Sequence, residues 1–473
     1  MTKQLIRGIA ILRATCNNLV YLIPLGLILA VSFAIRIINL EAVLDRWTDS
    51  DVYLTTAMLA YKGFPLYREI FCSQPPLIVW TMLLAFRLFG MNSFVGGLVG
   101  VSFSILGILG VFLIAKKVSS WRAGLAATIL LSFSPYYLWL SRSASNEIMF
   151  CALSTIAVYP FLVYLKGGNH KWLCGSGFLF GLCILAKFFA FFPLIVVAVY
   201  LAWKRDVKGI CFFTISAFLP LLSLLTVDFR GLVENAIIYQ LQKPPHTWLT
   251  KWRVTKEFLL SDPGLMVVGF VGIVYAFRQR DWLLWFMPFW FLVSFAGLVL
   301  QSELWFHHYI NVLPPLAVLA GFMLDRTLFR YPPKAVGITL LIGLVLGAST
   351  VVNRDHYYLY SFPRVYGPYS DTYSTATLVQ SLTKPNEFII SGDLLIPFLS
   401  DRPIPPFLTD LSWPRLQLGL VNSAMLIQAC QTYNVKVIVR CGRLDYFSDF
   451  ISYLHIYYER VAVIGSYWVY VRK

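Results

Sequence analysis

Long apolar segments separated by short polar loops fill the first three quarters of the chain. They lie approximately at 20–40, 94–115, 123–140, 148–165, 172–186, 188–203, 209–227, 264–277, 282–300, 310–324 and 335–352. A helix needs about 20 mostly apolar residues to cross the hydrocarbon core of a bilayer, so the shorter segments need cover from neighbouring helices. The pattern predicts a polytopic α-helical membrane protein with roughly eleven spans.

The loops between these segments predict an orientation. If the N-terminus is cytoplasmic, every inside loop is basic, as the positive-inside rule requires. The basic residues of those loops are Lys116, Lys117, Arg122, Lys166, Lys171, Lys204, Arg205, Lys208, Arg278, Arg280, Arg326, Arg330 and Lys334. The expected location is therefore the cell membrane, with the C-terminal end of the chain on the extracytoplasmic side.

This orientation requires that one further apolar stretch, 75–89, does not cross the membrane by itself. It is then re-entrant or tilted, which is tolerated only where protein or a wet cavity covers the backbone, and which therefore indicates a site. The alternative is that 75–89 does cross and that another misread segment compensates for it.

Hydropathy falls after residue 353. Short β-like runs at 387–392, 435–441 and 467–473 alternate with helix-like segments at 371–383 and 419–432. We expect 1–352 to form the membrane domain and 353–473 a small external α/β domain, in which PIPPF (403–407) is a loop. Cys430 and Cys441 can pair if this domain faces an oxidising compartment, and buried free thiols are the alternative.

Composition agrees with a membrane location. Of the 473 residues, 58% are hydrophobic and 13% are charged, whereas about a quarter of an ordinary soluble chain is charged. Lys and Arg at membrane surfaces account for the formal net charge of +16. No basic-aromatic nucleic-acid module is present, so membrane lipids are expected partners and nucleic acid is not.

The first outside loop, 41–93, collects residues that can carry chemistry. Its notable charged and polar members are Asp49, Asp51, Arg68, Glu69 and Gln74. Two acids close to a basic group can activate an acceptor or hold a divalent cation. The alternative is that Asp49 or Ser50 only caps the helix that follows.

Two charged residues at apolar spans lie on the same predicted side. Glu147 begins a span, and an acid at such a position is a functional candidate by default. The alternative is that Glu147 is only solvated at the membrane interface together with Arg142. Lys187 interrupts two apolar runs, so it either snorkels outward or directs its charge at an anionic ligand.

His307 and His308 can donate hydrogen bonds to phosphate oxygens, although paired interfacial histidines also occur as plain aromatic-belt residues. The sequence shows no matching set of nearby Cys, His or acidic ligands, so it gives little support to a zinc site. The loop 228–258 suits an amphipathic helix on the outer membrane surface.

As an ordered set, these residues resemble the GT-C class of membrane glycosyltransferases, especially the protein O-mannosyltransferase and lipid A aminoarabinose transferase group (glycosyltransferase family 39/83-like). The marks are Asp49-Ser50-Asp51-Val52-Tyr53, GFPLYREIF (63–71), SQPPL (73–77), Ser-Asn-Glu (145–147), GLCILAKF (181–188) and HHYINVLPPLAVLAG (307–321). The resemblance implies a GT-C fold with about 11–13 transmembrane helices. It also implies that the C-terminal domain is an accessory domain outside the membrane.

The resemblance implies an inverting enzyme. It would move a sugar from a polyprenyl (dolichyl or undecaprenyl) phosphate donor to a protein, lipid or glycan acceptor. Asp49 matches the catalytic acid of the first loop and Glu147 the second acidic position. The positions expected to bind substrate are Asp51, Tyr67, Arg68, Gln74, Lys187, His307, His308 and Tyr309.

Two departures from the family pattern concern the donor phosphate and the metal. Relatives often have Glu at the position of Ser50 and Lys at that of Gln74. The positive charge that this lysine would offer to the donor phosphate is therefore missing here, and Arg68 is its expected replacement. Asp49 and Asp51 would hold a divalent cation if one were used. The resemblance favours a reaction with no obligatory metal or other cofactor.

Two other classes of protein fit parts of the pattern. A transporter or flippase would need charges near the bilayer midplane and a repeated helix pattern, whereas here the polar residues gather at one surface. A non-enzymatic scaffold could keep the same fold without the chemistry, since fold does not fix function.

Overall fold

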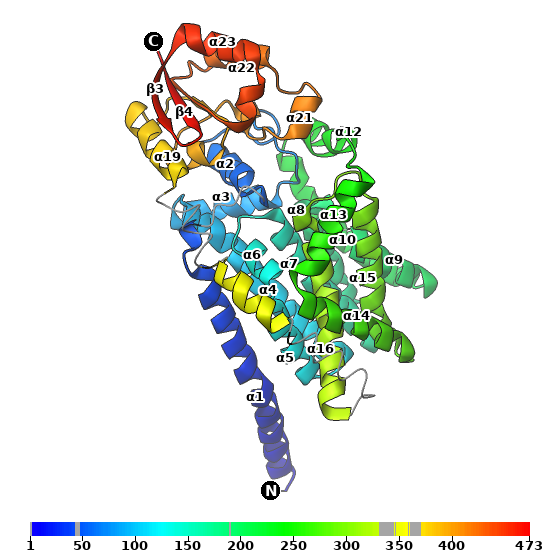
Figure 1. Cartoon of the computed structure of the whole chain (residues 1–473). Helices are drawn as coiled ribbons and strands as arrows, with labels where there is room; N and C mark the ends of the chain where they lie inside the picture. Colours follow the sequence, from blue (N-terminus) through cyan, green and yellow to red (C-terminus); the bar gives the residue numbers. More distant parts are fainter. Residues whose placement is uncertain are drawn as a thin grey trace.

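The computed structural model describes residues 2–42, 48–188, 191–330, 345, 347–357, 359 and 370–473. Its body is a bundle of apolar helices, with the C-terminal domain at one end and α1 extending away at the other (Figure 1). The bundle helices are α1 (Thr2–Ile37), α4 (Ser93–Val118), α5 (Trp121–Ser132), α6 (Pro135–Ser141), α7 (Asn146–Gly167), α8 (Lys171–Ala186), α9 (Phe191–Trp203), α10 (Val207–Leu221), α14 (Pro263–Arg278), α15 (Trp282–Leu300) and α16 (Leu313–Arg330).

Helices occupy ten of the eleven predicted apolar segments, and the last, 335–352, lies mostly outside the described residues. Six helices are long and apolar enough to cross a membrane, or up to eight if two bent pairs are each counted as one span. The first bent pair is α5 with α6, and the second is α14 with the preceding helix α13 (Trp248–Ser261). The structure thus confirms a polytopic helical membrane protein, and by helix length it supports fewer complete spans than the sequence predicted.

The predicted non-crossing stretch, 75–89, forms the helix α3 (Leu77–Phe89). With 13 residues and a rise of about 1.5 Å per residue, α3 is too short to cross a hydrocarbon core of about 30 Å alone. It follows α2 (Ser50–Tyr61), and both helices lie at the end of the bundle that faces the C-terminal domain (Figure 1).

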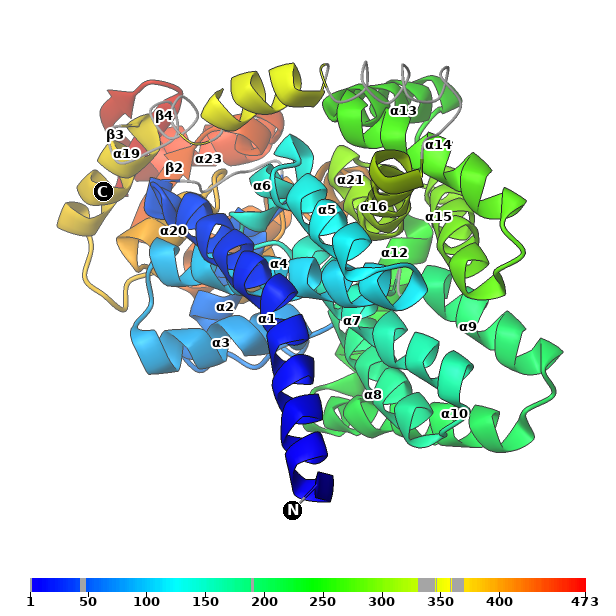
Figure 2. The ribbon, with the colours of Figure 1, turned by 90° about the horizontal axis from the view of Figure 1, so that it is seen from below.

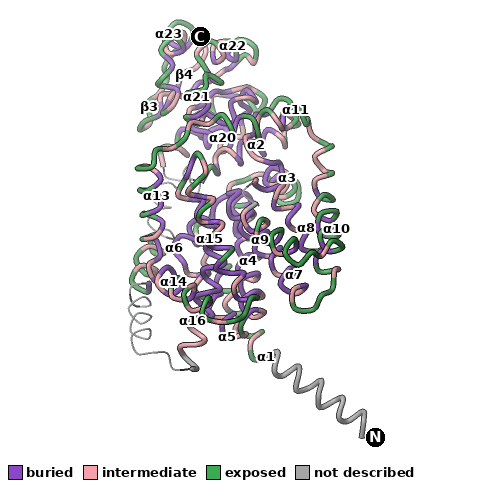
Figure 3. Tube along the Cα trace, turned by 90° about the vertical axis from the view of Figure 1, so that its right-hand side faces the viewer, coloured by how far each residue is buried: buried purple, intermediate pink, exposed green. Residues whose placement is uncertain are grey.

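Close packing at the centre of the bundle fixes the loop that leads into α7. The buried residues concentrate on central helices such as α4 and α7, whereas α10 faces outward over much of its surface (Figures 2 and 3). On α4, a Cβ at Gly100 would lie 2.1 Å from the carbonyl oxygen of Ser143. Only glycine therefore allows α4 to touch this loop, as small residues do at membrane helix contacts.

The C-terminal domain contains a mixed four-stranded sheet in the order β1-β2-β4-β3, with β1 parallel to β2 and the other neighbours antiparallel. The strands are β1 (Ile389–Ser391), β2 (Val437–Arg440), β3 (Tyr458–Ile464) and β4 (Tyr467–Arg472). The helices are α19 (Asp371–Leu382), α20 (Leu395–Ser400), α21 (Trp413–Gln417), α22 (Ser423–Thr432) and α23 (Ser448–Tyr457). The three predicted strands and two predicted helices are confirmed, while β3, α20, α21 and α23 were not foreseen. The predicted loop 403–407 ends in a single 3₁₀ turn, and Cys430 and Cys441 are free buried thiols.

This domain packs on α2 and α3 through polar and aromatic contacts. The Thr55 hydroxyl donates a hydrogen bond to the Leu394 carbonyl at 2.6 Å, and the Lys62 ammonium lies 2.7 Å from a carboxylate oxygen of Asp401. Through these contacts the C-terminal domain covers part of the first outside loop.

Candidate active site

An ion pair between Glu147 and Lys187 joins two helix ends on the side of the C-terminal domain. Glu147 lies in the first turn of α7, and Lys187 directly follows α8. Both side chains are buried, and the ammonium group contacts carboxylate oxygen Oε1. The Ser145 hydroxyl donates a hydrogen bond of 2.7 Å to the other oxygen, Oε2. The carboxylate is therefore held from two directions.

The side chain of Asn146 fixes the distance between these helix ends. Its amide donates a hydrogen bond to the carbonyl oxygen of Ala186, the last residue of α8. Lys187 points inward to Glu147, which rules out the snorkelling alternative for this lysine.

The two histidines reach the same place from η6, a 3₁₀ helix (Phe306–Val312) that leads into α16. His307 Nε2 lies 3.7 Å from Glu147 Oε1. His308 Nδ1 accepts the backbone N–H of Trp305 at 3.4 Å, and the Gln301 side-chain amide lies 2.8 Å from the same nitrogen. The proton of a neutral His308 therefore sits on Nε2, so this side chain can donate a hydrogen bond through that nitrogen.

Asp49 stands at the start of α2 with the left-handed backbone conformation φ 55°. Asp adopts this conformation at lower cost than most residues, and such positions are common where function requires them. Asp49 occupies the N-cap position, but its side chain makes no capping hydrogen bond, and it remains accessible to solvent. The alternative that its side chain serves as a helix cap is therefore wrong.

Several charged groups act on the Asp49 carboxyl. Partial burial raises its pKa above the ordinary value, and the negative charges of Glu147 and Asp410 raise it further. His307 and Lys187 act in the opposite direction. Asp49 thus lies within electrostatic reach of the Glu147 cluster, and a carboxylate with a raised pKa is a stronger base.

The remaining predicted residues of the first loop have other surroundings. Tyr67 is buried with φ 66°, and its hydroxyl donates a hydrogen bond of 2.7 Å to the Gln74 carbonyl oxygen, which shapes the loop. Arg68 is exposed and lines a groove of about 590 Å³ together with Asp228. Asp51 lies in the first turn of α2.

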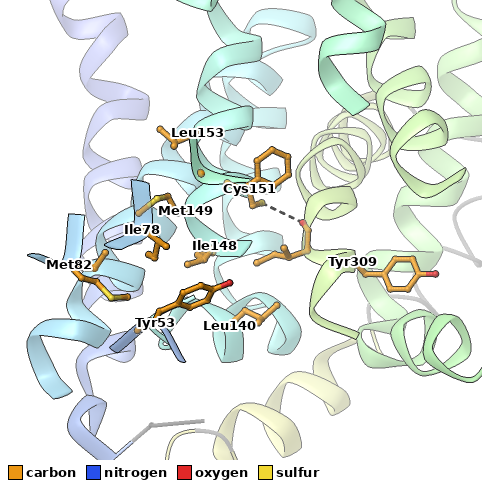
Figure 4. Packing of buried hydrophobic residues seen from close by; sticks show 14 of the residues in the cluster. Tyr53, Ile78, Met82, Leu140, Ile148, Met149, Cys151, Leu153 and Tyr309 are labelled. Atoms are coloured by element: carbon orange, nitrogen blue, oxygen red, sulfur yellow. Dashed lines mark hydrogen bonds between the residues drawn. The ribbon is translucent and has the colours of Figure 1, made fainter. Parts of the chain in front are cut away.

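Tyr309 does not join the cluster. Its ring stacks on Phe258 of α13 with centroids 4.4 Å apart, and its hydroxyl lies 2.7 Å from the Thr255 hydroxyl. Figure 4 shows the side chain turned away from Tyr53 and Ile148. The contacts of Tyr309 therefore hold α13 against η6.

The structure corrects the expectation that the histidines have no acidic ligand near them. Ligand atoms of Glu147, His307 and His308 all lie within 4.8 Å of one another, a grouping that can hold a metal ion. Lys187, however, places an ammonium group on the same carboxylate, and His308 presents an N–H. As arranged here, these donors suit an anion better than a metal cation.

Sequence reasoning gave no role to two residues that act electrostatically on the site. The buried Tyr53 lies on α2, and its hydroxyl is within electrostatic reach of Glu147, Asp49 and Asp410. Asp410 comes from the C-terminal domain, where no motif marks it. The position of Tyr53 within the acidic motif at the start of α2 could have indicated this residue. Only the packing of the C-terminal domain on the helix bundle reveals Asp410.

Taken together, these observations and the comparisons with known proteins show a fold similar to that of GT-C membrane glycosyltransferases. Residues 73–227 match the model of the family described as dolichyl-phosphate-mannose-protein mannosyltransferase. An uncharacterised protein of Aquifex aeolicus (strain VF5) is 25% identical over 315 residues, which cover 62% of this chain and 71% of that protein.

Solved structures share this fold. ArnT from Cupriavidus metallidurans in the apo state has a TM-score of 0.71 at 14% identity, covering 94% of this chain and 97% of that one. The apo oligosaccharyltransferase of Archaeoglobus fulgidus has a TM-score of 0.58 at 16% identity, covering 96% of this chain and 74% of that one. The predicted GT-C resemblance and fold class are confirmed.

Proposed function

We propose that this protein transfers a sugar from a polyprenyl phosphate, dolichyl or undecaprenyl, to a protein, lipid or glycan acceptor, with inversion at the anomeric carbon. The observation that carries the proposal is the buried cluster of Glu147, Lys187, His307 and His308, with Asp49 within electrostatic reach of Lys187 and His307. This reaction needs a general base to take the proton of the acceptor hydroxyl and hydrogen-bond donors to stabilise the leaving phosphate.

The similar structures support the donor class. One structure of ArnT from Cupriavidus metallidurans, with a TM-score of 0.70, is bound to undecaprenyl phosphate. One structure of the oligosaccharyltransferase AglB from Archaeoglobus fulgidus, with a TM-score of 0.57, is in complex with an inhibitory peptide and a dolichol-phosphate.

In the proposed reaction the acceptor hydroxyl oxygen attacks the anomeric carbon of the donor. Asp49 takes the hydroxyl proton, the bond from the anomeric carbon to the phosphate oxygen breaks, and polyprenyl phosphate leaves with the bonding electrons. Proton transfer to a positioned base contributes about 10²–10⁴ in rate. Lys187 and the histidine N–H groups stabilise the charge that develops on the phosphate. Glu147 holds Lys187 in place.

The surface around the site suits a lipid-linked substrate. The groove that contains Arg68 has apolar walls from α3, among them Val79, Trp80 and Leu83. We assign this groove to the polyprenyl chain. Arg68 would lie near the phosphate end of that chain and replace the lysine that relatives often have at the position of Gln74. Helix α13 exposes Trp248, Leu249 and Trp252, as expected for a helix at the membrane interface.

The placement of the charges favours a transferase over a transporter. Glu147, Lys187 and His307 all lie at helix ends next to α2 and the C-terminal domain, not halfway along a spanning helix. With the N-terminus in the cytoplasm, this end of the bundle is extracytoplasmic, which is where the lipid-linked sugar would be used.

The test is sugar transfer by the full-length protein in nanodiscs, with a panel of radiolabelled polyprenyl-phosphate sugars and parallel reactions containing EDTA. We expect D49N to lower turnover at least 100-fold while its melting curve stays unchanged, because the amide keeps the shape but takes no proton. The matched control is D401N, which changes an acid that pairs with Lys62. EDTA should have no effect.

Undiminished turnover in D49N would remove the base assignment. Transfer lost on chelation and restored by a divalent cation would show a metal-dependent enzyme and reverse the assignment of the Glu147 cluster to an anion. Failure of the wild type with every donor would favour the transporter or scaffold classes.

A further inference from the structure

A second cavity lies between helix ends, at the end of the bundle opposite the C-terminal domain. It has a volume of about 360 Å³ and is lined by the turn between α4 and α5, the loop between α14 and α15, and one face of α16. Helices α5 and α16 reach this end of the bundle in Figures 1 and 3. Three candidate membrane spans, Ser93–Val118, Trp282–Leu300 and Phe306–Thr327, begin or end here. The cavity therefore lies at a membrane surface, at the depth of lipid headgroups.

Two arginines line this cavity, Arg280 from the loop before α15 and Arg326 from α16. The Arg326 guanidinium lies over the Phe322 ring of its own helix, 5.2 Å from the ring centroid. Among the residues that the structure describes, neither arginine forms an ion pair. Guanidinium groups donate paired N–H groups in a geometry that fits phosphate oxygens. The cavity can therefore receive a phosphate group.

Two aspartates line the same cavity, and each has one carboxylate oxygen held by a neutral donor. Asp325 Oδ2 accepts a hydrogen bond of 2.8 Å from the Ser120 hydroxyl, and Asp281 Oδ1 accepts the backbone N–H of Leu283 at 3.0 Å. These donors orient the carboxylates but leave their charge in place, and an ionised carboxylate accepts several hydrogen bonds. The aspartates can therefore also accept hydrogen bonds from an ammonium group.

The charges that line the cavity are balanced, with one arginine for each aspartate. A simple anion would meet the two acids, and a simple cation would meet the two arginines. A ligand that carries one charge of each sign satisfies both pairs at once. Phosphoethanolamine is such a ligand, because two carbon atoms separate its phosphate from its primary ammonium. The apolar lining by Val118, Leu284 and Phe322 suits the hydrocarbon part of a lipid that carries this headgroup.

We propose that this cavity binds phosphoethanolamine, with the arginines on its phosphate and the aspartates on its ammonium. The same chemistry occurs in the headgroup of a phosphatidylethanolamine lipid and in the free phosphate ester, and the position at the membrane surface favours the lipid. A lipid bound here would contact the ends of α5, α15 and α16 together. The inference goes beyond the proposed function and does not depend on it, because the cavity and Asp49 lie at opposite ends of the bundle.

The test is lipid binding by the full-length protein in detergent, measured by native mass spectrometry with parallel melting curves. The probes are phosphatidylethanolamine, phosphatidylcholine and phosphatidylglycerol with the same acyl chains. Phosphatidylcholine keeps the phosphate, but its quaternary ammonium donates no hydrogen bond, and phosphatidylglycerol has no ammonium. We expect phosphatidylethanolamine to bind at least about tenfold more tightly than either, the factor expected for one charge-assisted hydrogen bond.

Two double variants separate the two halves of the ligand. R280Q/R326Q should weaken the binding of all three lipids by about tenfold or more, because all three carry the phosphate. D281N/D325N should weaken phosphatidylethanolamine alone, since asparagine keeps the acceptor oxygen but loses the charge. The matched control is R278Q, which removes an exposed arginine at the end of α14 that does not line the cavity and should bind lipid like wild type. The aspartate pair carries the test by itself if the arginine variant does not melt like wild type.

Either of two results would overturn the inference: phosphatidylcholine or phosphatidylglycerol bound as tightly as phosphatidylethanolamine, or equal losses of binding in R278Q and R280Q/R326Q. Free phosphoethanolamine in large excess then distinguishes the two sources of the ligand. If it displaces the lipid, and binds lipid-free protein with the same dependence on the variants, the cavity accepts the soluble ester. If it does neither while the lipid results hold, the site requires the membrane lipid. Both of these outcomes support the chemistry assigned to the cavity.

Discussion

The Glu147–Lys187 ion pair allows a quantitative test of the site. In K187M the ammonium is lost, and the buried carboxylate keeps the Ser145 hydroxyl at 2.7 Å and His307 at 3.7 Å. Removing one partner of a buried pair costs about 3–5 kcal/mol, because an uncompensated charge remains. Replacing both partners by neutral groups of similar shape is often close to neutral.

We therefore expect K187M to lower the free energy of unfolding by about 3 kcal/mol or more, and the double variant E147Q/K187M to recover most of it. The coupling energy of the double-mutant cycle should exceed about 2 kcal/mol, within the range for directly contacting residues. The measurement is equilibrium unfolding in mixed micelles of dodecyl sulfate and dodecyl maltoside. S145A, which removes only the hydroxyl contact, is the matched control and should cost about 1 kcal/mol.

A double variant as unstable as the sum of its singles would refute the pairing. The transfer assay adds a second criterion, since both K187M and the double variant lack the ammonium. Both should raise the KM for the donor, even though only K187M is destabilised. A donor KM restored in the double variant would show that Lys187 acts on stability alone and does not bind the phosphate.

Two further predictions concern groups around the site. Because the pKa of Asp49 is raised and a base must be deprotonated to act, kcat/KM should rise with pH through an apparent pKa above the ordinary value for aspartate. D49E should keep this rise of kcat/KM with pH, and D49N should lack it. A rise centred at the ordinary value would contradict the electrostatic assignment. Y309F removes the hydrogen bond to Thr255 and should lower the free energy of unfolding by about 1 kcal/mol. The KM for the donor should stay unchanged, and a raised KM would show that Tyr309 binds substrate.

Much of the architecture followed from local pattern. Hydropathy averaged over a window reports whether a segment prefers lipid, so the apolar helices and the short α3 could be predicted. Helix ends and bends could not, because they depend on packing between neighbours. The segment 123–140 is broken into α5 and α6 at 67°, for example, and α13 meets α14 at 95°.

The sequence by itself also determined which side chains stand at one end of the bundle, since residues at the ends of spans share a membrane surface. Only the tertiary structure decided their contacts. It paired Lys187 with Glu147, turned Tyr309 away onto Phe258, and brought Asp410 against Ser73 of the first outside loop. The physical reason is that electrostatic and hydrogen-bonding contacts depend on distance in space, and these partners are brought together by helix packing and domain docking across large separations in the chain.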